Sequence, residues 1–107
     1  MIHVALVLLM FQERWRPAVL AGSKTSTVRS KRHGSGGDEF EVDGERFVLT
    51  AVEPMTLGDA RDLLWREEGM DSPEEFERVW RDNHPRRGFQ KSDQVWAHRF
   101  ARVASIS

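Results

Sequence analysis

The dipeptide Asp43-Gly44 separates two runs of strand-forming residues, 39–42 and 46–53, near the middle of the chain. In the first run, apolar residues alternate with acids, which is typical of a strand with one buried face. Asp-Gly is a strong signal for a two-residue turn, because both turn positions require a positive φ that these residues tolerate. The sequence therefore predicts an antiparallel hairpin at this point.

The remaining segments predict more strands and helices without a repeated strand-helix-strand unit. Residues 2–11 are apolar throughout, as expected of a central strand buried on both faces. Gly22 is a natural end for a short helix, and Ser72 to Glu75 form a capping box that starts a longer one. In chain order we expect a strand at 2–11, a helix at 14–21, strands at 24–29, 39–42 and 46–53, helices from 56 or 58 to 69 and from 73 to 83, and a strand at 94–103. This order favours an α+β fold with a mostly antiparallel, curved sheet or small barrel and helices over its openings.

Length and cysteine content narrow the class of protein. The 107 residues are enough for one domain, 1–107, with one hydrophobic core. The absence of cysteine excludes disulfides and thiolate metal sites and is compatible with the cytosol. Residues 2–11 lack the positively charged start and the cleavage site of a signal peptide, and they are too few to span a membrane. We therefore expect a cytoplasmic protein with no membrane contact.

The histidines and most of the tryptophans are interpreted as structural residues. The four histidines show no spacing typical of metal ligands, and they are His3, His33, His84 and His98. We therefore expect no metal and no other cofactor. Trp65, Trp80 and Trp96 are expected in the hydrophobic core, and His98 in the core or at its rim.

Charge is segregated along the chain, although the net charge is only -1. The first 37 residues carry six Lys or Arg and one acid, residues 38–77 carry fourteen acids and three Arg, and residues 78–107 carry seven Lys or Arg and two Asp. If the two basic segments meet in space, they form a positive face that attracts a polyanion. The alternative is a mixed, solvated surface.

Residues 22–29, Gly-Ser-Lys-Thr-Ser-Thr-Val-Arg, contain most of the reactive side chains. A Lys, an Arg and four hydroxyls follow a predicted helix end, and such a group suits an anion or a polarised carbonyl, with Lys24 as a base. The segment is not a nucleoside-triphosphate-binding loop. That motif needs a glycine at the position of Pro17, and it also needs a helix after its lysine. The residues after Lys24 are strand formers instead.

This segment resembles the opening signature of the ASCH domain. The resemblance comprises Phe11-Gln12-x-x-Trp15 and the run from Val19 to Arg29, and it continues in residues 37–38, 67–76 and 95–100. ASCH domains are similar to the PUA superfamily. The resemblance therefore implies a small PUA-like β-barrel of about five to six mostly antiparallel strands, with helices flanking a cleft. It also implies that the partner is RNA or a modified nucleoside.

One branch of short bacterial ASCH proteins consists of N4-acetylcytidine amidohydrolases, which use a Lys, a Thr and a Glu. Motif matching places these roles on Lys24, Thr27 and Glu68, with Glu67 as the alternative carboxylate. In this hypothesis a neutral Lys24 takes the proton of Thr27, the Thr27 oxygen attacks the acetyl carbonyl, and Glu68 protonates the leaving amine. The backbone amides after Gly22 would hold the oxyanion.

The catalytic hypothesis sets two conditions on Lys24. An exposed lysine has a pKa of about 10.4, so burial and a nearby cation such as Arg29 must lower the pKa of Lys24. Lys24 must also precede the strand, because residues 24 and 27 of a regular strand point to opposite faces, whereas Thr25 and Thr27 share one. A Lys24 that stays charged would contact a phosphate or a carboxylate instead.

The main expectation is a cleft that binds RNA or a modified nucleoside. The residues expected to line it are Trp15, Gly22, Lys24, Thr25, Thr27, Arg29, Glu67 and Glu68. Trp15 would stack on a base, and Arg29 would reach a base edge or a phosphate. Hydrolysis of N4-acetylcytidine is the alternative function, and a domain that only binds another protein is the third hypothesis.

Overall fold

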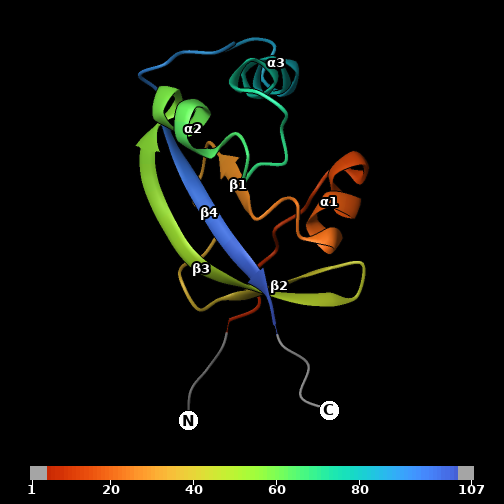
Figure 1. Ribbon diagram of the computed structural model, residues 1–107. Coiled ribbons are helices and arrows are strands. Elements are labelled where there is room, and N and C mark those ends of the chain that lie inside the picture. The colour runs from red at the N-terminus through yellow and green to blue at the C-terminus, as the bar shows by residue number, and fades with distance from the viewer. Residues whose placement is uncertain (1–4, 104–107) are drawn as a thin grey trace.

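The structure is a computed structural model that describes residues 5–103. Its sheet has four antiparallel strands in the order β1-β4-β3-β2, and their bounds are Ser26–Arg29 for β1, Glu39–Val42 for β2, Glu45–Thr56 for β3 and Gln94–Arg102 for β4. The long strands β3 and β4 curl together, so the sheet is a half-barrel (Figure 1). The α+β class and the antiparallel pairing are confirmed, but the described residues form four strands rather than about five to six.

β2 and β3 form the predicted hairpin. Asp43 and Gly44 both have a positive φ, 49° and 83° respectively, as a two-residue turn of this kind requires. β3 then continues to Thr56, past the predicted end at residue 53. Its pairing with β4 shifts by one residue between Leu49 and Ala51. A bulge of this kind bends a strand and increases its twist, which contributes to the curl of the sheet.

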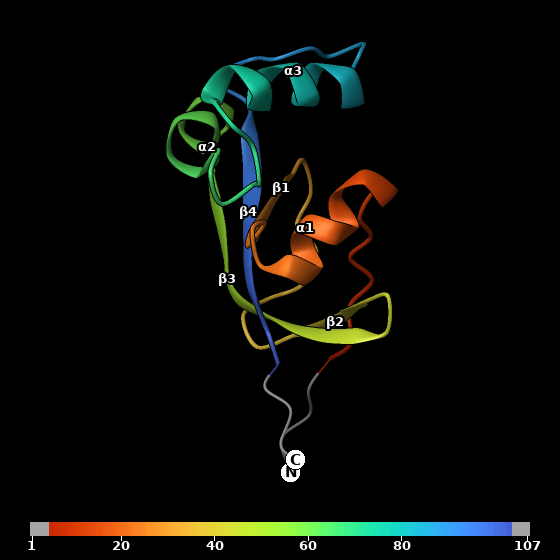
Figure 2. The same cartoon turned by 45° about the vertical axis from the view of Figure 1, so that its right-hand side comes forward.

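Two helices cover one end of the half-barrel and a third lies beside it (Figures 1 and 2). The elements are a 3-10 helix at Glu13–Trp15, α1 at Arg16–Ala21, α2 at Leu57–Leu64 and α3 at Pro73–Asn83. α2 packs on the ends of β3 and β4 and against α3, whereas α1 contacts β2. None of the helices within residues 5–103 has the length and apolar character needed to cross a membrane.

The helix ends follow the predicted capping signals, with one exception. The Ser72 hydroxyl accepts a hydrogen bond from the Glu75 amide at 3.1 Å, and α1 ends at Gly22 with a φ of 84°. α2, however, ends at Leu64 and not at residue 69. Residues 65–69 instead form a turn that ends at Gly69, whose φ is 83°. This turn carries the two glutamates of the predicted site.

The prediction of a central strand at residues 2–11 is wrong for the described part, residues 5–11; residues 2–4 lie outside the described chain. Only Leu6 forms a bridge, to Glu39 at the edge of the sheet. Leu9 and Phe11 are buried, but the intervening side chains Leu6, Leu8 and Met10 are exposed. The segment borders β2 rather than lying inside the sheet, so it buries only one of its two faces.

The apolar side chains form two core clusters. The first joins α2, α3 and the adjacent strand ends, and it comprises Val28, Leu57, Ala60, Leu64, Met70, Phe76, Trp80, Phe89, Val95 and Ala97. The second lies under α1 and the hairpin, and it comprises Leu9, Phe11, Val19, Phe40, Val42, Phe47, Leu49 and Phe100. Five polar or charged side chains are also buried, namely Lys24, Ser26, Thr27, Glu68 and His98. Buried polar groups need partners, and these five define the candidate site.

Candidate functional site

A cavity of about 410 Å³ lies between the segment that enters α1, strand β1 and helix α3. Figure 2 shows the segment that enters α1 and helix α3 extending to the same side of the long strands β3 and β4. Five of the predicted site residues line the cavity, namely Trp15, Lys24, Thr27, Arg29 and Glu68. Small-molecule sites in proteins have volumes of about 300–1,000 Å³, so the cavity is large enough for a ligand. We call it the Lys24–Glu68 pocket.

The three other predicted residues do not line this pocket. Gly22 caps the end of α1. The backbone of Thr25 is used within the fold, because its amide donates to the Glu67 carbonyl and its carbonyl accepts from the Phe100 amide. The Glu67 side chain points elsewhere and lies 3.6 Å from the guanidinium of Arg99. Glu68 is therefore the carboxylate of the pocket, and Glu67 is not.

The free edge of β1 holds Glu68 in place. β1 pairs with β4 on one side only, so its outward backbone groups need other partners. The Val28 amide donates to one carboxylate oxygen of Glu68 at 2.9 Å, and the Ser26 hydroxyl donates to the other at 2.5 Å. The amides of Thr25 and Ser26 both donate to the Glu67 carbonyl. The turn after α2 thus takes the place of a neighbouring strand.

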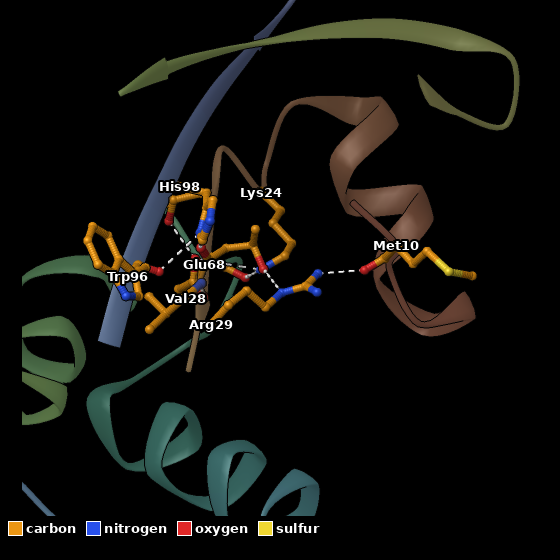
Figure 3. A network of polar contacts seen from close by, with 9 residues as sticks. Met10, Lys24, Val28, Arg29, Glu68, Trp96 and His98 are labelled. Carbon is orange, nitrogen blue, oxygen red and sulfur yellow. Dashed lines mark hydrogen bonds and ion pairs between the residues drawn. The ribbon is translucent and has the colours of Figure 1, made fainter. Parts of the chain in front are cut away.

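Lys24 lies two residues before the start of β1 and not within it, as the catalytic hypothesis requires. Its side chain is 4% exposed. The ammonium donates to the Glu68 carbonyl at 3.0 Å and lies 3.7 Å from the nearer Glu68 carboxylate oxygen. It also lies 5.4 Å from the centre of the Trp15 ring. Figure 3 shows Lys24 and Glu68 facing each other at the start of β1.

Burial changes the acid-base properties of both partners. Burial lowers the pKa of Lys24, the positive charge of Arg29 lowers it further, and the negative charge of Glu68 opposes this change. Burial raises the pKa of Glu68, against the effects of Lys24 and of the hydrogen bonds from Ser26 and Val28. The two shifts bring the pKa values closer together. Burial thus disfavours the charged form of both side chains, and their opposite charges partly offset this effect.

Thr27 belongs to a second polar pair in the pocket. Arg29 donates to the Thr27 hydroxyl oxygen at 2.9 Å and to the Met10 carbonyl at 2.5 Å, and its guanidinium lies over the Phe11 ring. No hydrogen bond joins Lys24 to Thr27 in the described chain, although both line the pocket. Figure 3 shows the Arg29 side chain extending from β1 toward Met10.

The expected oxyanion site after Gly22 is not present. The amides of Ser23 and Lys24 both donate to the Ala18 carbonyl, at 3.0 and 3.1 Å. The next two amides donate to the Glu67 carbonyl. These amides close the end of α1 and the edge of β1, so they have no free hydrogen to offer a ligand.

Helix α3 supplies an apolar wall that the sequence interpretation assigned to the core alone. Phe76, Val79 and Trp80 line the pocket as well as the first core cluster. The Trp80 indole nitrogen is buried and has no hydrogen-bond partner in residues 5–103. Across the pocket mouth, the Gln12 side-chain amide donates to the Asn83 side chain at 3.0 Å. The helical spacing of 76, 79 and 80 was the signal for this face, but it does not show that the face borders a cavity.

His98 is fully buried behind Thr27. One ring nitrogen, Nδ1, lies 3.2 Å from the Thr27 carbonyl and 3.1 Å from the Trp96 carbonyl. The other, Nε2, accepts a hydrogen bond from the His33 amide at 2.9 Å. Two carbonyls on one side and an amide on the other fit the neutral ring with its proton on Nδ1. His98 therefore attaches the loop after β1 to the sheet.

The predicted positive face forms only in part. β1 and β4 are neighbours, so the two basic segments of the sequence do meet. However, Arg99 lies 3.6 Å from Glu53 and Arg102 lies 2.9 Å from Glu45. Acids of the middle segment thus neutralise the arginines of β4. No group of three or more His, Asp or Glu within residues 5–103 is arranged to hold a metal ion.

Comparison with known proteins supports the fold. The sequence matches no protein-family model and no curated protein. Among solved structures, the chain is similar to protein EF3133 from Enterococcus faecalis V583, which is described by the family DUF984. The two are 21% identical, the match covers 96% of this chain and 82% of that one, and the TM-score is 0.68. At this identity the similarity establishes a shared fold.

Proposed function

We propose that the protein binds a modified nucleoside, or a nucleotide of RNA, in the Lys24–Glu68 pocket. The observation that carries the proposal is a buried Lys–Glu pair that borders a cavity of small-molecule size. Burying two charges costs folding free energy that a well-packed apolar pair would avoid, so stability alone does not account for the pair. Titratable groups with shifted pKa values that line a cleft are common in functional sites.

The resemblance to the ASCH domain suggests the class of ligand. The DUF984 family of the structural neighbour falls within the ASCH and PUA-like group. The shared fold is therefore compatible with the resemblance carried by residues 22–29. The shared fold does not specify the ligand, so the nucleoside is proposed from the resemblance and from the chemistry of the pocket.

The hydrogen-bond inventory of the pocket favours a ligand that carries carbonyl oxygens. Lys24 has three donors, of which the Glu68 carbonyl takes one. Thr27 accepts from Arg29, so its own hydroxyl hydrogen is free to donate. Both groups thus offer donors, which suits a pyrimidine carbonyl or the carbonyl of an acetylated amine. Trp15, half-buried at the pocket wall, offers a face for base stacking.

Calorimetric titration with N4-acetylcytidine tests the proposal. We expect saturable binding to the wild-type protein and loss of binding in Lys24→Met, which keeps the apolar stem but removes the donors; circular dichroism at the assay temperature checks that the variant is folded. Lys91→Met is the matched control, because Lys91 is exposed and does not line the pocket. Equal binding by all three proteins, or none by the wild type, would contradict the proposal.

Hydrolysis of N4-acetylcytidine to cytidine and acetate is a second candidate function. The lowered pKa of Lys24 favours it, because a neutral lysine is able to act as a base at neutral pH. Lys24 would remove the Thr27 proton and the alkoxide would attack the acetyl carbon. The C–N bond would then break as the cytosine amine takes a proton through Glu68, and water would release acetate from Thr27. This path requires the Lys24 ammonium to move from the Glu68 carbonyl toward Thr27.

An assay of cytidine release separates the two functions. Turnover that is lost in Thr27→Val and in Lys24→Met would establish the hydrolase. Thr27→Val replaces the hydroxyl by a methyl group of nearly the same volume, so it removes the nucleophile and the acceptor for Arg29 but keeps the side-chain shape. Binding of N4-acetylcytidine without release of cytidine would leave binding as the function and exclude this reaction.

A further inference from the structure

One wall of the pocket is positively charged. Arg29, Lys31 and His33 line it in sequence order, at the end of β1 and the start of the following loop. We call these three residues the rim cluster. Burial and the positive charges of Arg29 and Lys31 lower the pKa of His33. All three residues line the same pocket, so their side chains are close enough to act on one ligand together.

Within residues 5–103 no carboxylate touches the cations of the rim cluster, although the negative charge of Glu68 acts on Arg29 from a distance. Among residues 5–103, neither Arg29 nor Lys31 forms an ion pair. Glu68 is the only acid that lines the pocket, and its two carboxylate oxygens are held by Ser26 and Val28. By contrast, the arginines of β4 are each paired with a glutamate.

Arg29 is the most informative member of the cluster. Its side chain is partly buried, and this burial lowers the pKa of Arg29, while the charge of Glu68 opposes the change. Its hydrogen bonds go to two neutral oxygens, the Thr27 hydroxyl and the Met10 carbonyl. A partly buried guanidinium without a carboxylate partner is costly to the free protein. An anionic ligand would offset that cost.

We infer that the pocket takes a phosphorylated nucleoside, with the phosphate at the rim cluster and the base beside Lys24 and Trp15. This inference rests on the proposed function and specifies the substrate class. Arginine and lysine side chains at the mouth of a partly closed cavity recognise a phosphate through charge-assisted hydrogen bonds. The phosphate is a terminal 5′ or 3′ group on a mononucleotide, or a link within RNA. All three share the chemistry that the rim cluster recognises.

The apolar wall on α3 gives the ligand a defined orientation. Phe76, Val79 and Trp80 face the pocket from the side of α3, whereas the rim cluster lies at the end of β1. A base is apolar on its two faces and a phosphate is strongly hydrated. The base therefore occupies the deeper, more apolar part, and the phosphate stays at the mouth near water.

Competition between phosphorylated and unphosphorylated ligands tests the inference. We would titrate the wild-type protein with N4-acetylcytidine, its 5′-monophosphate, its 3′-monophosphate and a short RNA that contains it. The best phosphorylated form should bind about tenfold tighter than the nucleoside at low salt, since a hydrogen bond to a charged group has this magnitude. The advantage should shrink as salt rises. The arm that shows the largest advantage identifies the source of the phosphate.

Lys31→Gln provides the decisive variant, and Lys91→Gln is its control. Both lysines are exposed, so neither change threatens folding. Lys31→Gln should remove most of the advantage of the phosphate while leaving affinity for the nucleoside unchanged, and Lys91→Gln should alter neither. Equal affinities for nucleoside and all phosphorylated forms would overturn the inference but leave the proposed function standing. Failure of every ligand to bind would overturn both.

Discussion

The hydroxyl of Ser26 donates a hydrogen bond of 2.5 Å to the carboxylate of Glu68, 42 residues further along the chain. Both side chains are buried. This contact, with the bond from the Val28 amide, holds the Glu68 carboxylate on the free edge of β1. Glu68 in turn positions the Lys24 ammonium through its own carbonyl. The geometry of the pocket therefore depends on a residue that the sequence motif does not mark as chemical.

We predict that Ser26→Ala destabilises the protein by about 1.5–3 kcal/mol, the usual contribution of a hydrogen bond to a charged group. Loss of the donor leaves one Glu68 oxygen with only Lys24 nearby, at 3.7 Å. Urea unfolding measures the change. Ser23→Ala is the control, since its hydroxyl bonds to the Ala18 carbonyl at an exposed position. Equal losses of unfolding free energy in the two variants would show that the Ser26–Glu68 hydrogen bond stabilises the protein no more than an exposed one.

A double-mutant cycle should reveal strong coupling between Lys24 and Glu68. Removing one partner of a buried pair leaves an uncompensated charge and costs about 3–5 kcal/mol. We therefore expect Lys24→Met and Glu68→Gln each to be strongly destabilising. The double variant should lose less than the two single losses combined, with a coupling energy of about 1–3 kcal/mol. Strictly additive free energies of unfolding would mean that the two groups do not interact.

Gly69→Ala should disturb the pocket through Lys24. Gly69 has a φ of 83°, and a Cβ added there would lie 3.3 Å from the Lys24 Cβ. Gly44 has the same φ but no atom within 4 Å of an added Cβ. Both alanine variants carry the backbone strain of about 1 kcal/mol, but only Gly69→Ala should weaken binding of N4-acetylcytidine. Unchanged affinity in Gly69→Ala, or an equal loss in Gly44→Ala, would contradict the predicted contact.

His98 should make the protein less stable in mild acid. Burial lowers the pKa of His98 below its ordinary 6.5, against the hydrogen bonds to the Thr27 and Trp96 carbonyls, and the charges of His33 and Arg29 lower it further. As pH falls below 6.5, the unfolded chain binds a proton that the folded protein excludes. The contribution of His98 to the free energy of unfolding is therefore complete above pH 6.5. It falls by up to about 1.4 kcal/mol per pH unit as the pH drops toward the lowered pKa.

His98→Gln keeps a hydrogen-bonding side chain but cannot be protonated. Urea unfolding of the wild type and of this variant, each near pH 7.5 and near pH 5, measures the effect. The loss of stability on acidification should be smaller in the variant. His33 retains a contribution of the same sign, since its pKa is also lowered. A loss of equal size in both proteins would exclude His98 as a source of the pH dependence.

Local signals predicted the parts of the fold that depend on neighbouring residues. The hairpin at Asp43-Gly44 and the cap at Ser72 each follow from a few adjacent side chains. The strand prediction at residues 2–11 was wrong in its described part, because hydrophobicity alone does not tell an edge from the centre of a sheet. The position of a segment in the sheet depends on distant partners such as Glu39.

The sequence motif predicted those residues of the site that lie within it. Lys24, Thr27 and Arg29 line one pocket, but the choice between Glu67 and Glu68 required the turn after α2. Because adjacent side chains in this turn point in different directions, the Glu67 carboxylate reaches Arg99 on the surface and the Glu68 carboxylate reaches Ser26 inside. Lys31 lies outside the motif, and the apolar residues of α3 have the spacing of an ordinary core-facing helix. Neither feature marks a pocket in the sequence, and only the three-dimensional arrangement brings them to it.

The most direct test of the account is where the ligand binds. Titration of 15N-labelled protein with N4-acetylcytidine, followed by amide and indole NMR signals, locates the contact. A separate groove lies between residues 6–11 and the end of β2, and Leu6 and Val42 line it. We predict that the Val28 amide and the indole signals of Trp15 and Trp80 shift together, while the amides of Leu6 and Val42 at that groove stay in place. Shifts confined to that groove, or no shifts at saturating ligand, would contradict the assignment of the Lys24–Glu68 pocket as the binding site.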